Sequence, residues 1–269
     1  MIRQPAVAGM FYPGQEQALH AELHACMGDA PASGRSPAYG VIVPHAGYRY
    51  SGRIAGETLA KVRVPSRVIL LGPNHHGLGA PAALFAEGRW RTPLGDVAVD
   101  AALASHLLES CPGLASDPQA HLHEHSLEVL LPFLQCVNPA AQIVPICFGR
   151  MKGQELITLG KTLQLALKAL GEDVLIVAST DMSHYIAAAL AARRDHLAIE
   201  RMLALDPEGL LATVAAHDIS MCGVYAVTVL LAAARQRGGV AATLIRYGHS
   251  GEVTGDLDQV VGYAGLVLR

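Results

Sequence analysis

Three short apolar runs, each followed directly by a polar motif that contains histidine, constrain the fold of this chain more than any other feature. The runs occupy residues 41–43, 68–71 and 174–177, and the motifs after them are PHAGY, GPNHH and STDMSHY. Open α/β sheets bind their ligands where strands end. Imidazole is the commonest protein metal ligand and the usual acid or base near neutral pH. The pattern therefore predicts a metal-dependent or histidine-based active site at one edge of a sheet.

Segments of strand and helix character alternate along the 269 residues. We therefore expect one α/β sandwich, with residues 1–269 forming a single domain around a mostly parallel or mixed central sheet. The expected helices are 16–27, 51–62, 126–137, 155–170, 193–205, 207–217 and 223–235. Further strands are expected at 142–148, 242–247 and 260–268, a hairpin or meander at 80–100, and a loop at 28–37. Near-continuous apolar runs predict strands that are covered on both faces.

The composition argues against several classes of protein. Hydrophobic residues make up 51% of the chain and charged residues 16%, and the formal net charge is −3 without a long basic or acidic run. This balance does not suggest nucleic-acid binding. No stretch has the apolar length of a membrane span or of a signal peptide. Five scattered cysteines without a CxxC pair predict reduced thiols and a cytoplasmic location, and the apolar content leaves room for a homo-oligomer interface.

The first two motifs each offer a candidate metal ligand. His45 follows Pro44 in a tight turn, and Tyr48 of the same motif can form the wall of a pocket. In the second motif His75 and His76 are adjacent and should point in different directions. We expect His75 to face the site. His76 would line the cleft or hydrogen-bond to a metal-binding residue. A lone histidine in such a loop is more often merely packed there, and the presence of the other motifs is what favours ligand binding.

The third motif and a later segment, HLHEHSLE, supply further candidates. Asp181 and His184 are three residues apart, so a helical turn would place both on one side, whereas the alternative is a helix cap beside an exposed histidine. Glu124 and His125 can bind metal, relay protons or cap the helix that follows. His121 is expected to be the most solvent-exposed member of its segment.

Cys222 lies just before an apolar helix. The positive end of a helix lowers a thiol pKa, and a thiolate is a good ligand for zinc, copper or iron. The alternative is that Cys222 is a small buried hydrophobic residue. For Cys222 taken alone, a metal ligand and a small buried hydrophobic residue are equally favoured interpretations.

Together these motifs resemble the Memo family. In chain order the matching motifs are RxPAVAGxFYP, PHAGY followed by SG, LGPNHH, WxTPLG, EHSLExxLPFLQ and STDxSHY. They extend from Arg3 to the last strand, so the resemblance covers essentially the whole chain. It implies a fold like that of the class III extradiol dioxygenases, which are non-haem iron enzymes that open catechol rings.

Carried over by motif, the resemblance also implies roles for individual residues. His45 and His75 would be the histidine ligands of a metal ion, and Cys222 would replace the carboxylate ligand of the dioxygenases, as in Memo proteins generally. His184 would be the acid/base and Asp181 would line the same cleft. The implied cofactor is a metal ion, with iron or copper favoured and zinc allowed. Two histidines and a carboxylate suit O₂ activation at Fe(II), whereas a set of two histidines and a cysteine would prefer copper or zinc, or bind iron with altered redox behaviour.

Three functions are compatible with these expectations. The first is a metal-dependent oxidoreductase that acts on O₂ or a phenol-like substrate, in which His184 moves a proton. The second is a non-catalytic metal- or peptide-binding partner, because bacterial relatives often accompany radical-SAM and AMMECR-type proteins. The third is a zinc hydrolase, in which metal-bound water is the nucleophile. The resemblance names no substrate.

Overall fold

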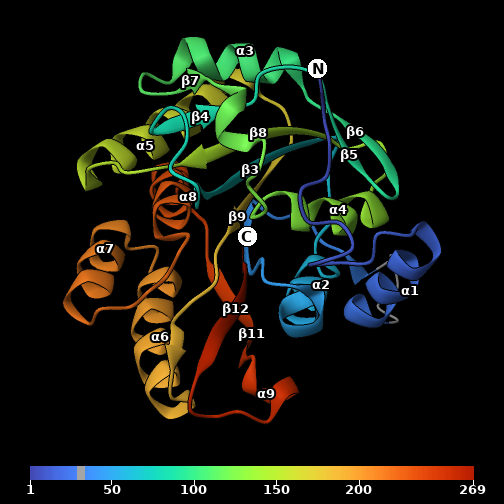
Figure 1. Ribbon diagram of the computed structural model, residues 1–269. Helices are drawn as coiled ribbons and strands as arrows, with labels where there is room; N and C mark the ends of the chain where they lie inside the picture. The colour runs from blue at the N-terminus through green and yellow to red at the C-terminus, as the bar shows by residue number, and fades with distance from the viewer. Residues whose placement is uncertain (29–33) are drawn as a thin grey trace.

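A nine-stranded mixed sheet forms the centre of the computed structural model, which describes residues 1–28 and 34–269 (Figure 1). Part of the loop predicted at 28–37, residues 29–33, lies outside the described residues. The strands lie in the order β10-β12-β2-β9-β3-β8-β4-β7, and β11 pairs with β12. Their bounds are β2 (Gly40–Val43), β3 (Arg67–Pro73), β4 (Ala82–Leu84), β7 (Ala115–Ser116), β8 (Gln142–Phe148), β9 (Val174–Ser179), β10 (His184–Ile186), β11 (Ala242–His249) and β12 (Val260–Leu268). The predicted α/β architecture with a mixed sheet is confirmed.

The central strands of the sheet run parallel to one another. β2 pairs with β9, β9 with β3, and β3 with β8, each in parallel orientation. β12 and β4 flank this group in antiparallel orientation. Parallel strands end at the same edge of a sheet, so the segments that follow β2, β3 and β9 leave it side by side. These are the segments that contain PHAGY, GPNHH and STDMSHY.

Helices cover both faces of the sheet, and the strand side chains alternate between two hydrophobic cores. Ile42 and Ile69 pack into one core, and Val41 and Val68 pack into the other. Figure 1 shows α5, α6, α7 and α8 on the left of the sheet and α1, α2 and α4 on the right. The helix bounds are α1 (Glu16–Met27), α2 (Arg53–Leu59), α3 (Ala101–Ser110), α4 (Leu131–Val137), α5 (Gly153–Leu170), α6 (Ala188–Leu203), α7 (Pro207–Ala216), α8 (Val224–Arg237) and α9 (Gly251–Thr254). Burial on both faces explains the unbroken apolar runs of the central strands.

A second, three-stranded sheet brings the N-terminal residues close to the site. Its strands are β1 (Ile2–Arg3), β5 (Arg89–Thr92) and β6 (Gly95–Ala98), and β5 and β6 form the hairpin expected around TPLGD. Arg3 is buried and forms an ion pair with buried Glu128. Its guanidinium also donates to the carbonyl oxygens of His121, at 3.0 Å, and Glu124, at 2.6 Å. Arg3 therefore ties the N-terminal segment to the loop before α4.

Two predicted helices are shorter than expected, and each has a local cause. The helix predicted at 51–62 is a π-helical turn, Tyr48–Gly52, followed by α2, and it ends early because Val62 forms a β-bridge with Ser36. The helix predicted at 126–137 consists of a 3₁₀ turn, Glu128–Leu130, followed by α4. Pro132 lies in the first turn of α4, where its missing N–H costs little, and a longer helix would place it in the interior.

Two other helices depart from the sequence-based expectation in the opposite direction. α6 begins at Ala188, before the predicted start at residue 193. α3 was not predicted at all, although Asp100 caps it by accepting the N–H of Leu103 at 2.9 Å. Its signal was a single capping residue directly after a predicted hairpin, and that signal was missed.

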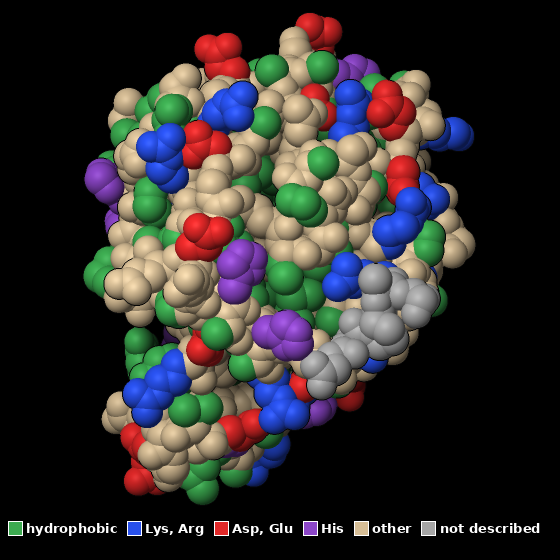
Figure 2. Space-filling view, turned by 90° about the vertical axis from the view of Figure 1, so that its right-hand side faces the viewer, with side chains coloured by type: hydrophobic (Ala, Val, Ile, Leu, Met, Phe, Trp, Pro, Cys, Tyr) green, Lys and Arg blue, Asp and Glu red, His purple; other side chains and the backbone are tan. Residues whose placement is uncertain are grey.

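The surface agrees with a chain of low charge content. On the face over the right-hand side of Figure 1, acidic and basic side chains are interspersed and gather into no large patch of one sign (Figure 2). Within the described ranges, no helix combines the length and the apolar character needed to cross a bilayer.

Candidate metal centre

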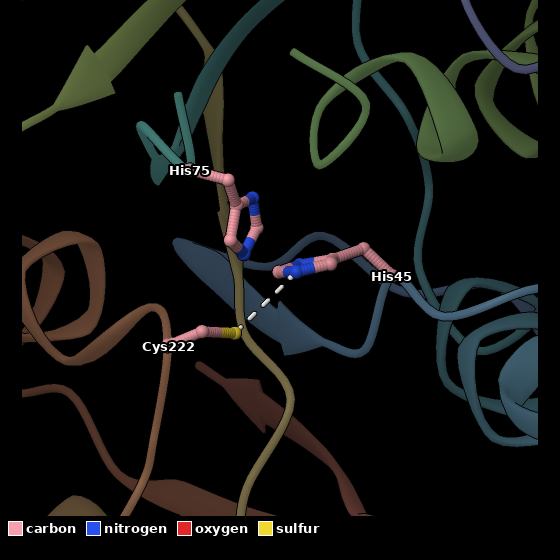
Figure 3. Close-up of side chains that lie close together, drawn as sticks. All are labelled: His45, His75 and Cys222. Carbon is pink, nitrogen blue, oxygen red and sulfur yellow. Dashed lines mark hydrogen bonds between the residues drawn. The ribbon is translucent and has the colours of Figure 1, made fainter. Parts of the chain in front are cut away.

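His45, His75 and Cys222 converge at the edge where the parallel strands end. One ligand atom of each lies within 4.8 Å of the others. His45 follows β2, His75 follows β3, and Cys222 lies just before α8. In Figure 3 both rings and the sulfur are turned toward a shared space. Donor atoms around a tetrahedral ion lie about 3–4 Å apart, so small side-chain adjustments would bring all three onto one ion.

The hydrogen bonds of His45 determine which ring nitrogen faces Cys222. Its Nδ1 lies 2.7 Å from Ser179 Oγ, and that hydroxyl donates its only proton to the carbonyl oxygen of Ser126 at 2.7 Å. The hydroxyl must therefore accept from His45, which places the ring proton on Nδ1. Burial lowers the pKa of His45 to about 3, so the ring is neutral at physiological pH. The lone pair on Nε2 is left facing Cys222 Sγ at 3.4 Å.

His75 is held in the same way by Glu124. The Nδ1 of His75 lies 2.8 Å from Glu124 Oε1, and its backbone N–H donates to Oε2 at 2.6 Å. Burial opposes ionisation of Glu124, but the hydrogen bonds from His75 and from the N–H of Ser126 outweigh it and hold the pKa of this carboxyl below its usual range. An ionised carboxylate only accepts, so His75 carries its proton on Nδ1 and offers Nε2 as a ligand. Carboxylates commonly orient metal-binding histidines in this manner.

Cys222 differs from the sequence-based expectation in its protonation. Burial raises the pKa of its thiol, with a further contribution from the charge of Asp181, whereas a position before α8 was expected to lower it. The thiol is therefore neutral without a metal ion and donates toward the free Nε2 of His45. Burial wins because Cys222 lies two residues before the first turn of α8, beyond the range of strong helix-dipole effects. Binding of a metal ion would displace the thiol proton.

Asp181 and His184 line the same cleft, although not through the helical turn that their spacing suggested. The chain after β9 is irregular, and His184 begins strand β10. Asp181 accepts the backbone N–H of His45 at 2.9 Å, and burial raises the pKa of its carboxyl. His184 Nδ1 lies 2.9 Å from the carbonyl oxygen of Ser220, so Nδ1 is the protonated nitrogen and Nε2 is free. Asp181, His184 and Cys222 also bring ligand atoms within 4.8 Å of one another.

His125 forms one wall of the site. Its ring stacks on His75 with centroids 4.6 Å apart, and it meets the ring of His45 edge-on at 5.5 Å. Phe11, from the N-terminal segment, covers its other side at 4.8 Å. Burial lowers the pKa of His125 to about 4, so this ring too is neutral. His125 therefore packs against the rings of His45 and His75 and adds no charge to the site.

A cavity of about 530 Å³ opens in front of these groups. Its lining residues are Met10, Phe11, His45, Ala46, Gly47, Tyr50, His75, His125, Asp181, His184, Tyr185, Ser250, Thr254, Asp256, Gln259, Val261 and Tyr263. Tyr48, predicted as a pocket wall, does not line this cavity and borders a separate hollow beside the N-terminal segment. It lies at the start of the π-helical turn, is buried against Phe133, and donates to the carbonyl oxygen of Val129. The same turn places Tyr50 at the cavity instead.

Two other histidines also fall outside the cavity. His76 is exposed, and its Nε2 lies 2.9 Å from the carbonyl oxygen of His123, so adjacent His75 and His76 do point in different directions. His121 was expected to be exposed and is fully buried. Its two nitrogens contact the carbonyl oxygen of Ala83 at 3.0 Å and Cys147 Sγ at 3.3 Å, so it is a structural residue of the core.

Several residues of the site gave no clear signal in the sequence. Ser179 and Ser220 orient His45 and His184, but only the folded chain shows that their oxygens lie at the imidazole nitrogens. Tyr263 reaches the cavity from β12, outside any of the motifs, whereas Tyr185 is the last residue of STDMSHY and lies in β10. Phe11 belongs to the opening motif, and this was the one available clue to its position.

The donor set fits a metal ion. Two imidazoles direct Nε2 at the shared space, their Nδ1 atoms are held by buried acceptors, and a thiol that can be deprotonated completes a mixed nitrogen and sulfur set. Such donors suit zinc, copper and iron. The cavity leaves room for further ligands.

Comparison with known proteins finds relatives over nearly the whole chain. The sequence model of a family described as "Memo-like protein" matches residues 3–267. MEMO1 family proteins of Methanopyrus kandleri and Aquifex aeolicus are each 39% identical to this chain, over 100% and 99% of it and 99% of each relative. An uncharacterized protein from Escherichia coli K12 has a similar structure, with a TM-score of 0.53 and 15% identity over 83% of this chain and 98% of that chain. At that identity the similarity concerns the fold alone.

Proposed function

The chain belongs to the Memo family, and from that premise we propose that it is a metal-dependent oxidoreductase whose ion is held by His45, His75 and Cys222. The observation that carries this proposal is the state of the two histidines. Each ring has its proton on Nδ1, held by a buried acceptor, and its free Nε2 directed at the space shared with the sulfur. Surface histidines rarely have this arrangement, whereas metal-binding histidines commonly do.

The ion would supply electron transfer and polarisation of bound groups, and the chain's own residues would do the rest. His184 presents Nε2 at the cavity while Ser220 holds its Nδ1, so it is placed to take a proton from a substrate hydroxyl. Asp181 holds the backbone of His45 and lies within reach of His184. The rings of Phe11 and Tyr263 give the cavity part of its apolar lining. All five cysteines are free thiols, which supports a reducing, cytoplasmic setting.

We favour iron or copper over zinc as the working ion. The thiolate of Cys222 is a soft donor that suits Cu(I), the imidazoles suit both copper and iron, and the cavity leaves coordination positions open. Zinc bound at the same donors would favour hydrolysis instead. The identity of the metal that supports turnover therefore distinguishes oxidoreductase activity from hydrolysis.

Metal binding is tested first, with chelator-treated full-length protein titrated with Fe²⁺ under anaerobic conditions, with Cu⁺ and with Zn²⁺. We expect one ion per chain and loss of that binding in Cys222→Ser. Cys136→Ser, which changes an exposed cysteine, is the matched control and should bind normally. Co²⁺ substitution should give a thiolate charge-transfer band that Cys222→Ser lacks. Equal binding by Cys222→Ser would contradict the proposed ligand set.

Turnover is tested separately, by oxygen uptake with iron- or copper-loaded protein and a panel of phenols and catechols. His184→Gln should retain the ion and lose turnover, because an amide cannot exchange a proton as imidazole does. No uptake with any substrate and either metal would argue against an oxidoreductase. Hydrolysis of ester or phosphate substrates by the zinc form alone would move the assignment to a zinc hydrolase.

A further inference from the structure

The charges around the cavity are one-sided. Among the residues that the structure describes, its lining includes the acidic residues Asp181 and Asp256 but no lysine or arginine. Burial raises the pKa of Asp181, so exposed Asp256 is the source of negative charge. Asp256 accepts the backbone N–H groups of Asp258, at 2.8 Å, and Gln259, at 3.3 Å, and has no cationic partner within the described chain. A carboxylate at the mouth of a pocket without a neutralising cation leaves the entrance negative.

Two arginines, Arg49 and Arg246, have other contacts and do not line the cavity. Arg49 lies over the ring of Tyr50, 5.8 Å from its centroid, and lines a separate hollow beside the N-terminal segment. Arg246 forms ion pairs with Glu57, at 3.2 Å, and Glu252, at 3.4 Å, so its charge is already compensated.

A bound divalent ion would not reverse the sign either. Histidines bind a metal ion as neutral imidazoles, so the thiolate of Cys222 would cancel one of the two positive charges. The ionised carboxylate of Glu124, directly behind His75, would cancel the other. Asp256 then still leaves the entrance negative.

The walls of the cavity are aromatic. Phe11, Tyr50, Tyr185 and Tyr263 all line it. Tyr185 is 72% exposed at the mouth, while Tyr263 is only 2% exposed and lies deep in the wall. Aromatic faces attract ammonium groups through their quadrupoles and also accept planar apolar bodies. Negative charge and aromatic rings therefore favour the same kind of ligand.

We propose that this cavity selects organic cations, namely an ammonium group on an aromatic body, and discriminates against the corresponding anions. The inference deepens the proposed function and rests on it in one respect, that the cavity beside the metal centre is where the substrate binds. The aromatic walls hold the ring, and Asp256 at the mouth pairs with the ammonium group.

The test uses three probes with a common phenylethyl body: 2-phenylethylammonium, neutral 2-phenylethanol and anionic 3-phenylpropanoate. Their dissociation constants are measured by NMR titration of the chelator-treated full chain at neutral pH and low salt. We expect the ammonium to bind about tenfold more tightly than the carboxylate, with the alcohol between them, as attraction and repulsion at a partly exposed carboxylate imply. A carboxylate that binds as tightly as the ammonium, or no binding by any probe, would overturn the proposal.

Three variants assign the selectivity to its source. Asp256→Asn should weaken the ammonium about three- to fivefold and leave the alcohol unchanged. Asp258→Asn, which changes an exposed carboxylate outside the cavity lining, is the matched control and should have no comparable effect. Tyr185→Ala should weaken all three probes by a similar factor. An equal effect of the Asp256 and Asp258 variants would contradict the assignment to Asp256.

Because the probes are titrated into metal-free protein, this test of the cation site does not depend on the proposed metal centre. Loss of charge selectivity would contradict the cation site alone. A chain that selects the ammonium but binds no iron, copper or zinc would contradict the metal centre alone.

Discussion

The histidines of the cleft take their ligand form from groups that lie behind them. Ser179 and Glu124 accept the Nδ1 protons of His45 and His75, and a serine carbonyl does the same for His184. Other hydrogen bonds fix the acceptor role of Ser179 and Glu124. Ser179 donates its only proton to a carbonyl oxygen, and Glu124 also accepts two backbone N–H groups. The acceptors behind the rings therefore determine which nitrogen of each ring remains free to face the cleft.

The replacement Glu124→Gln should weaken metal binding by about 10–100-fold, the usual cost of removing such a partner. Glutamine has one acceptor oxygen for the three N–H groups that Glu124 now satisfies, so the ring of His75 loses its fixed orientation. The measurement is zinc titration against a chromophoric chelator. Glu87→Gln, at an exposed carboxylate, is the control, and similar affinities for the two variants would refute the role given to Glu124.

Acid should destabilise the fold through its buried histidines. Burial lowers the pKa of His45 to about 3 and those of His121 and His125 to about 4, against about 6.5 in an unfolded chain. Between these values the unfolded chain binds more protons than the folded one, so the free energy of unfolding falls as the pH falls below about 6.5. Each histidine contributes at most about 1.4 kcal/mol per pH unit.

Urea unfolding of the metal-free chain at a series of pH values from neutral to mildly acidic checks this expectation. His121→Gln removes one of the titrating groups away from the cleft and should flatten the dependence. Stability that stays constant or rises on acidification would show that these rings are not buried in neutral form.

At the level of elements, the packing of α5 on α8 depends on one residue without a side chain. A Cβ on Gly160 would lie 2.5 Å from the carbonyl oxygen of Val229 and 2.6 Å from Ala232 Cβ. Backbone atoms cannot move aside as the end of a flexible side chain can. These two helices cover the face of the sheet that contains Ile42 and Ile69, so their spacing also sets the depth of that core.

Gly160→Ala should therefore lower the free energy of unfolding by about 1–3 kcal/mol, the usual cost of overpacking. Helix propensity alone predicts the opposite, a gain of about 1 kcal/mol. Thr158→Ala, at an exposed position of the same helix, is the control and should raise stability by a few tenths of a kcal/mol. Denaturant unfolding of the three proteins decides between propensity and packing, and a stabilised Gly160→Ala would rule out the close approach.

At the scale of the whole molecule, the N-terminal segment and the site depend on each other. Buried Arg3 connects the carbonyl oxygens of His121 and Glu124 to the carboxylate of Glu128. Glu128 in turn accepts the hydroxyl of Tyr12 at 2.7 Å, as well as backbone N–H groups of the N-terminal segment. The loop that holds Glu124 is thus fixed by residues more than a hundred positions earlier in the chain.

Arg3→Met should cost about 3–5 kcal/mol of stability, because it leaves the carboxylate of Glu128 buried without its cation. The exposed pair of Arg63 and Asp173 provides a control, since Arg63→Met should cost no more than about 1 kcal/mol. Thermal or urea unfolding measures both. Similar values for the two variants would mean that the Arg3 pair contributes no more than a surface ion pair.

The sequence predicted elements and motifs better than it predicted contacts. The central strands and α5 lie where the apolar pattern indicated, because burial on both faces leaves a strong local signature. α3 was missed because its only signal is the capping residue Asp100. The extent of α4 was misjudged because Pro132 determines where that helix begins. Tyr48 and His121 were misplaced because a motif does not say which of its side chains faces inward.

The amino-acid sequence by itself determined the alternation of strands and helices, the family, and the short list of histidines and the cysteine that meet in the cleft. These features are local, since each depends on residues within a few positions of one another. Only the tertiary structure decided that β2, β9 and β3 lie side by side in parallel, which brings His45 and His75 together. It alone also decided the protonated nitrogens, the neutral thiol of Cys222 and the negative mouth at Asp256. Those properties arise from burial and from partners distant in the chain, and no local pattern encodes them.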